Sequence, residues 1–178
     1  MKYILLLAAL LTSNAFAAPD FDETMAAAKQ GEAYAQANLG IMYAKGEGVP
    51  ENDAEAGKWF RKAADQGYAD AQYNLGIMYD NGDGVPENDA EAVKWYRKAA
   101  VQGFADAQAN LGVMYALGEG VPENSIRAYV WWSMAKAQGI TDASNNLEIL
   151  KPQMTKQQIA DAQALAATCY ESDYKDCD

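Results

Sequence analysis

Two residues in this sequence have the types and spacing of a catalytic pair. Ser133 and Lys136 form the motif Ser-x-x-Lys, in which serine is the nucleophile of penicillin-binding proteins and serine β-lactamases. Those enzymes also need a Ser-Asp-Asn and a Lys-Thr-Gly element. The nearest matches here, 144–146 (Ser-Asn-Asn) and 172–174 (Ser-Asp-Tyr), are poor substitutes. The chain also has no histidine, which excludes Ser-His-Asp triads and histidine-containing zinc sites. We therefore expect no enzymatic activity.

A metal site is the second chemistry to consider, because a twelve-residue stretch from Asp80 to Glu91 has an acid at each end, like a calcium-binding loop. Two ligand positions inside it are Gly82 and Gly84, and Val85 stands where the loop requires glycine. The sequence therefore predicts a turn here, with no metal and no cofactor.

The two cysteines, Cys169 and Cys177, lie close together in the C-terminal tail. An even cysteine count in an exported chain indicates a disulfide. A redox site is disfavoured, because the spacing is not Cys-x-x-Cys and Lys175 is the one nearby cation. We predict a structural disulfide that holds the tail to the last helix.

The N-terminus has the pattern of a secretory signal peptide. Met1-Lys2 precedes an apolar run from Tyr3 to Leu11, and Ala15-Phe16-Ala17 has the small residues of a cleavage site. We assign residues 1–17 to this signal and expect a periplasmic or secreted protein. No later apolar run approaches the length of a membrane span, so no membrane insertion is expected after cleavage.

The chain is acidic, with 25 Asp and Glu against 14 Lys and Arg and a formal net charge of −11. Such a charge repels phosphate backbones, so nucleic acid is not an expected partner. Much of the acidity is local, because acids flank the start of predicted helices and bases lie towards their ends, which complements the helix dipole.

These candidate residues belong to a chain that repeats every 36 residues, with about half the positions identical in all three copies. The copies are residues 31–66, 67–102 and 103–138, a pattern typical of stacked-repeat proteins. In the middle copy, apolar residues at helical spacing predict a first helix over 69–79. A capping-box pattern, Asn88 to Glu91, then starts a second helix with the stripe Ala92, Trp95, Tyr96 and Ala99.

A glycine recurs inside each first helix, at Gly40, Gly76 and Gly112. An interior glycine costs a helix about 1 kcal/mol relative to alanine. Its recurrence at one position predicts a close approach by a neighbouring helix that a side chain would block.

The ends of the chain depart from the repeat. Residues 18–30 fit an N-terminal capping helix, and residues 139–178 hold C-terminal capping helices and the disulfide tail. Residues 142–150 repeat the opening of a first helix, and Thr155 with Gln158 forms another capping-box pattern. We expect one continuous solenoid of eight helices.

The unit resembles the Sel-1-like repeat, a relative of the tetratricopeptide repeat. The resemblance rests on A-x-A-Q-x-N-L-G-x-M-Y-x-x-G-x-G-V and the following A-x-x-W-[FYW]-x-x-A, and it covers residues 31 to about 150. It implies an all-α fold, a right-handed α/α solenoid of antiparallel helix pairs whose first helices line a concave surface. It also implies a protein-interaction scaffold.

Candidate binding residues are the positions of each first helix opposite its core-facing side. The asparagines recur in every copy and can hydrogen-bond a peptide or satisfy backbone groups between helices. The aspartates favour a partner with lysine or arginine. The predicted groove comprises Tyr34, Asn38, Ile41, Asp70, Tyr73, Asn74, Ile77, Asp80, Asp106, Asn110 and Val113.

The sequence thus predicts an exported, monomeric scaffold that binds a protein or peptide on its concave face. Two alternatives remain. Cysteine-rich relatives in the wider repeat family are described as weak β-lactamases or penicillin binders, which would use Ser133. The same groove could also bind a host protein, as in a secreted virulence factor.

Overall fold

The computed structural model describes residues 20–177, in which all regular structure is helical. The predicted signal peptide, residues 1–17, lies outside this range. The described residues form nine α-helices, one more than the eight expected, although each of the nine lies in a segment that the sequence predicts to be helical. The elements are α1 (Phe21–Lys29), α2 (Ala33–Lys45), α3 (Asp53–Asp65), α4 (Ala69–Asn81), α5 (Asp89–Ala100), α6 (Ala105–Leu117), α7 (Ser125–Ala137), α8 (Thr141–Leu150), the short 3₁₀ helix η1 (Lys151–Gln153) and α9 (Lys156–Glu171).

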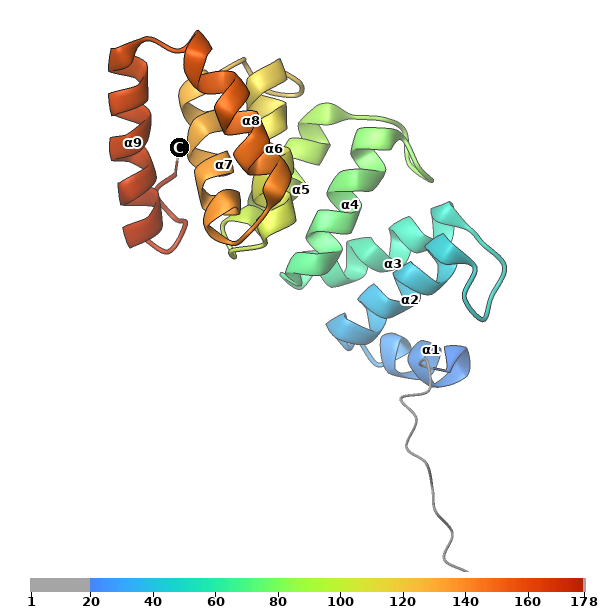
Figure 1. Ribbon diagram of the computed structural model, residues 1–178. Helices are drawn as coiled ribbons and strands as arrows, with labels where there is room; N and C mark the ends of the chain where they lie inside the picture. Colours follow the sequence, from blue (N-terminus) through green and yellow to red (C-terminus); the bar gives the residue numbers. More distant parts are fainter. Residues whose placement is uncertain (1–19, 178) are drawn as a thin grey trace, which may run out of the picture.

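The helices pack in chain order, which confirms the predicted all-α solenoid. Each helix contacts the next one from α1 to α8, and α9 packs against α7. Figure 1 shows these helices following one another along a curved stack. Helices α2, α4 and α6 are the first helices of the three units, and α8 occupies the same place in the partial fourth unit.

Local signals set the helix ends. The side-chain oxygens of Asn52, Asn88 and Asn124 accept hydrogen bonds from the third backbone N–H of α3, α5 and α7. In a capping box the Glu91 side chain would accept from the backbone N–H of Asn88, but that N–H donates to the Tyr79 carbonyl at 2.8 Å, and Glu91 pairs with Lys94 at 3.1 Å. The last helix has the complete capping box between Thr155 and Gln158.

The interior glycines lie under aromatic rings, which confirms the predicted close approach. A Cβ added at Gly76 would lie 2.6 Å from the ring of Tyr96 in the paired helix α5. The corresponding separations are 2.7 Å from Phe60 at Gly40 and 2.5 Å from Trp132 at Gly112. In each unit the second helix therefore presents an aromatic residue to the first.

Buried glutamines connect successive units. Gln72, 4% exposed, donates a 3.1 Å hydrogen bond from Nε2 to the Ala64 carbonyl at the end of the preceding helix. Its Oε1 accepts a 2.7 Å bond from Nε2 of Gln102. The neighbouring units repeat this arrangement, so the buried amides are satisfied and hold the register of the stack. The equivalent sets are Gln36 with Ala28 and Gln66, and Gln108 with Ala100 and Gln138.

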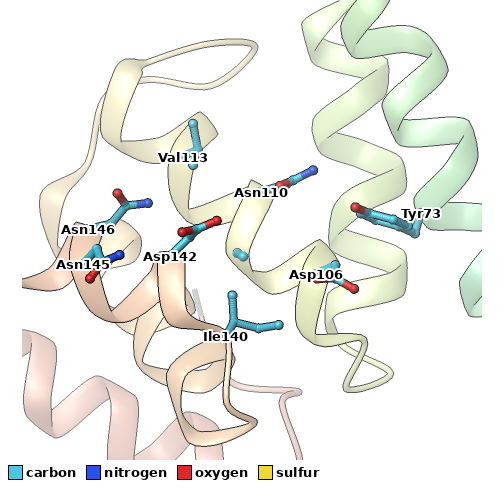
Figure 2. A pocket seen from close by; sticks show the side chains of 9 residues that line it. Tyr73, Asp106, Asn110, Val113, Ile140, Asp142, Asn145 and Asn146 are labelled. Atoms are coloured by element: carbon cyan, nitrogen blue, oxygen red, sulfur yellow. The ribbon is translucent and has the colours of Figure 1, made fainter.

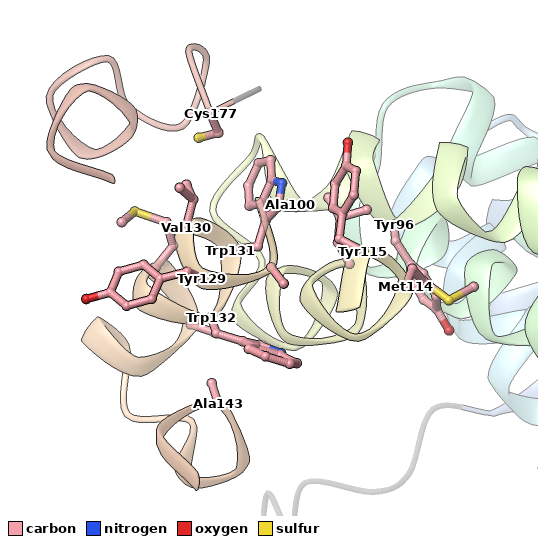
Figure 3. Close-up of a cluster of buried hydrophobic side chains, with 14 of the residues drawn as sticks. Tyr96, Ala100, Met114, Tyr115, Tyr129, Val130, Trp131, Trp132, Ala143 and Cys177 are labelled. Atoms are coloured by element: carbon pink, nitrogen blue, oxygen red, sulfur yellow. The ribbon is translucent and has the colours of Figure 1, made fainter. Parts of the chain in front are cut away.

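The largest core cluster lies in the C-terminal half, around the fully buried Trp131 and Tyr115 (Figure 3). Cys169 and Cys177 belong to this cluster, and the predicted disulfide joins them with a Cα–Cα distance of 4.4 Å. Both cysteines are buried. The disulfide thus holds the tail against the core and covers the end of the solenoid.

Candidate functional site

A hollow of about 620 Å³ lies where the first helices α4, α6 and α8 meet. We call it the acidic hollow. Figure 2 shows Asn110 of α6 between Asp142 of α8 and Tyr73 of α4, so three successive units contribute to one site. Its lining comprises Tyr73, Asp106, Ala109, Asn110, Val113, Ile140, Asp142, Asn145 and Asn146.

The aromatic wall of the hollow is Tyr73. Its ring centroid lies 5.0 Å from that of Phe104 and 6.0 Å from that of Tyr96, distances typical of packed aromatic pairs. Burial raises the pKa of the Tyr73 phenol, and the negative charge of Asp106 raises it further. Tyr73 is therefore held in place beside a carboxylate.

Two carboxylates make the hollow negative. Asp106 and Asp142 lie in the first turns of α6 and α8, at equivalent positions one repeat apart, and both are exposed. The helix dipole favours a negative charge at these positions. The lining contains no lysine or arginine. A cation entering the hollow would meet carboxylates and amide oxygens, with no basic side chain in the lining to oppose it.

Two of the recurring asparagines, Asn74 and Asn110, have partners within the protein. Asn110 makes a side-chain hydrogen bond with Tyr96, whose hydroxyl donates to Oδ2 of Asp80 at 3.0 Å. Burial and Asp80 raise the pKa of Tyr96. Asn74 donates from Nδ2 to the Asp70 carbonyl at 2.8 Å. These contacts give Asn74 and Asn110 a structural role, and their use in binding stays a prediction.

Seven of the eleven predicted groove residues line one of two hollows. Tyr73, Asp106, Asn110 and Val113 line the acidic hollow. A second hollow of about 210 Å³, between α2 and α4, is lined by Ile41, Asn74 and Ile77 together with residues such as Phe60 and Lys45. The linings of both hollows leave out four predicted residues, namely Tyr34, Asn38, Asp70 and Asp80.

Two of those four residues have clear contacts elsewhere. Tyr34 is 64% exposed and packs edge-on against Tyr68, with ring centroids 6.3 Å apart. Asp80 accepts the hydrogen bond of Tyr96 described above. These four positions lie outside the linings of the two hollows, and the single groove stays a prediction.

Sequence reasoning missed the contribution of α8, namely Asp142, Asn145 and Asn146. The signal was present, because these residues follow Asp106, Ala109 and Asn110 by one period of 36. The partial repeat was interpreted only as a cap, since it loses the second half of the first-helix motif.

The candidate catalytic serine has a structural contact. Ser133 Oγ donates a 2.7 Å hydrogen bond to the Tyr129 carbonyl one turn earlier in α7, and Ser133 lines neither hollow described above. Within residues 20–177, no three His, Cys, Asp or Glu side chains are grouped as a metal site would require. The same range has no helix that is long and apolar enough to cross a membrane.

Comparison with known families agrees with the repeat geometry. The profile of the Sel1 repeat matches residues 33–68, 69–104 and 105–140, which is more than half of the chain. The chain belongs to the Sel1 repeat family. The three matched units have the predicted period of 36 residues, and each begins two residues after the corresponding predicted unit. The predicted unit boundaries themselves stay predictions.

Solved structures are similar to this Sel1 repeat protein over most of its length. One is c5321, a protective antigen present in uropathogenic Escherichia coli strains, with 36% identity and a TM-score of 0.79. The match covers 86% of this chain and 33% of the antigen, so the chain spans a third of that relative's length. A search of curated proteins found no match.

Two further structures support the family fold. A Sel1 repeat protein from Oxalobacter formigenes is 38% identical with a TM-score of 0.66, over 71% of this chain and 96% of its own. The Helicobacter pylori cysteine rich protein B is 23% identical with a TM-score of 0.57, over 71% of this chain and 90% of its own. The last match shows similarity of fold alone.

Proposed function

We propose that this Sel1 repeat protein is an exported scaffold that binds a protein or peptide on the face formed by α4, α6 and α8. The observation that carries the proposal is the acidic hollow, to which three successive units contribute side chains. A binding role without catalysis fits the bonded hydroxyl of Ser133.

Two observations support export. The disulfide between Cys169 and Cys177 is of a kind that persists in oxidising compartments such as the bacterial periplasm. The pattern of residues 1–17 is that of a secretory signal. We propose the periplasm as the location, with the protein acting as a monomer.

The proposal is tested by capturing partners from a cell-envelope extract on the purified protein and on a Tyr73→Ala/Asn74→Ala variant. We expect a specific partner to be lost from the variant. Tyr170→Ala is the matched control, because Tyr170 is an exposed tyrosine on α9, outside the lining of the acidic hollow. Circular dichroism verifies that all three proteins are folded. Equal capture by all three proteins would exclude this face as the binding surface.

A second candidate is a host-facing factor that uses the same face. The observation that favours it is the 36% identity to a protective antigen. Fractionation of cells that produce the tagged protein separates the two locations. Recovery from the medium or the cell surface would support this candidate, whereas recovery from the periplasm alone would exclude it.

A further inference from the structure

Next to the acidic hollow lies a smaller one of different character. Its volume is about 230 Å³, and it lies between the end of α6 and the end of α8. We call it the apolar hollow. Leu117 and Ile149 are part of its lining and are 63% and 64% exposed, so two large aliphatic side chains face solvent around one depression. The full lining comprises Ala116, Leu117, Trp132, Asn146, Ile149, Leu150 and Gln153.

The two hollows adjoin each other, because Asn146 lines both. Asp106, Asp142 and Tyr73 lie on one side of this asparagine, and Leu117 and Ile149 lie on the other. A ligand that crosses Asn146 therefore passes from a negative, aromatic surface to an aliphatic one. The Asn146 amide can both donate to and accept from the backbone of such a ligand.

Charge decides which side chain fits the larger hollow. Its lining has two carboxylates and no basic residue, so a carboxylate-bearing chain end or an acidic peptide would be repelled. Lysine or arginine would gain charge-assisted hydrogen bonds to Asp106 or Asp142 and could lie against the Tyr73 ring. A second copy of this chain, with a net charge of −11, is a poor occupant.

We propose that the ligand is a peptide segment in which a lysine or arginine lies close to a large aliphatic or aromatic residue. The basic side chain enters the acidic hollow, and the apolar side chain covers Leu117 and Ile149. This inference rests on the proposed function and adds the chemical class of the partner. Exposed apolar residues that line one depression and adjoin a polar site are typical of protein-interaction surfaces.

The test selects binders from a displayed library of random peptides on the purified protein. We expect the selected sequences to combine a basic residue with a large apolar one nearby. A selected peptide is then labelled, and its affinity is measured by fluorescence anisotropy against two double variants. These are Asp106→Asn/Asp142→Asn and Leu117→Ser/Ile149→Ser.

Each double variant should weaken binding by about tenfold or more, the effect of losing one strong contact. Raising the salt concentration should weaken binding to the parent protein more than binding to the aspartate variant, because the variant has lost two of the charges whose attraction salt screens. The matched control is Tyr170→Ser/Glu171→Gln, which removes one exposed apolar group and one charge on α9. It should bind like the parent.

The outcomes separate this inference from the proposed function. The inference would be overturned if the selected peptides contained no basic residues. It would also be overturned if they bound both double variants as tightly as the parent protein. The proposed function would still stand if Tyr73→Ala removed their binding. If the library yields no peptide that binds the parent better than the Tyr73→Ala/Asn74→Ala variant, the inference is overturned, and the capture experiment alone decides the proposed function.

Discussion

The fit between an interior glycine and an aromatic ring can be tested with one methyl group. In Gly76→Ala the new Cβ would lie 2.6 Å from the ring of Tyr96, well inside van der Waals contact. The ring has little room to move, because Tyr96 is fully buried and its hydroxyl is bonded to Asp80. Overpacking of this kind costs about 1–3 kcal/mol, and we take the upper end here.

The same substitution also has a favourable effect, since alanine stabilises a helix interior by about 1 kcal/mol relative to glycine. We therefore expect Gly76→Ala to lower the free energy of unfolding by about 2 kcal/mol, the difference between these two effects. Urea unfolding followed by circular dichroism at 222 nm measures this change.

Gly57 in α3 provides the matched control. A Cβ there would lie 3.2 Å from the terminal methyl of Met78, a flexible side chain that can move aside. The equivalent positions already hold buried Val93 and Tyr129. Gly57→Ala should therefore raise the free energy of unfolding by up to about 1 kcal/mol. Equal changes in the two variants, or a gain in Gly76→Ala, would refute the argument that ring contact requires the glycine.

Two further predictions concern the tail and alkaline pH. Replacing Cys169 and Cys177 with serine should reduce the free energy of unfolding by about 2–3 kcal/mol, because the unfolded chain is then no longer held in a short closed loop. An unchanged midpoint of thermal unfolding would contradict this prediction. The folded-state pKa of Tyr96 is raised above 10, first by burial and then by Asp80. The protonated Tyr96 phenol contributes fully to stability below about pH 10, its pKa in the unfolded chain. This contribution is lost as the pH rises towards the pKa of Tyr96 in the folded protein. The free energy of unfolding should therefore fall less steeply above pH 10 in Tyr96→Phe than in the parent protein, and equal slopes would count against this assignment.

Most of the fold could be predicted because its signals are local. A period of 36 residues, asparagine caps such as Asn88 and apolar stripes such as the one containing Trp95 specify helix pairs without long-range information. The capping box at Thr155 was also predicted and is present. A local error is Glu91, whose carboxylate can reach either its cap or Lys94, and which pairs with Lys94 in the structure.

The candidate site was predicted in part. Tyr73, Asp106 and Asn110 were expected on a binding face, and they line the acidic hollow. Tyr34 was expected on the same face; it lies outside the lining of the acidic hollow and packs against Tyr68. The helix period shows which side of a helix a residue occupies, but the curvature of the stack determines which helices approach closely enough to enclose a volume.

By itself, the sequence determined the order of the repeated helix pairs, the recurrence of glycine at position 76 and the pairing of the two cysteines, because each depends on spacing along the chain. Only the tertiary structure decided that Tyr96 covers Gly76 and that Asp142 and Asn146 of the partial repeat complete a hollow begun by α4 and α6. It also placed Leu117 beside Ile149, 32 residues apart in the sequence. These residues come together because successive helix pairs stack with a small rotation, and the sum of those rotations cannot be obtained from one repeat alone.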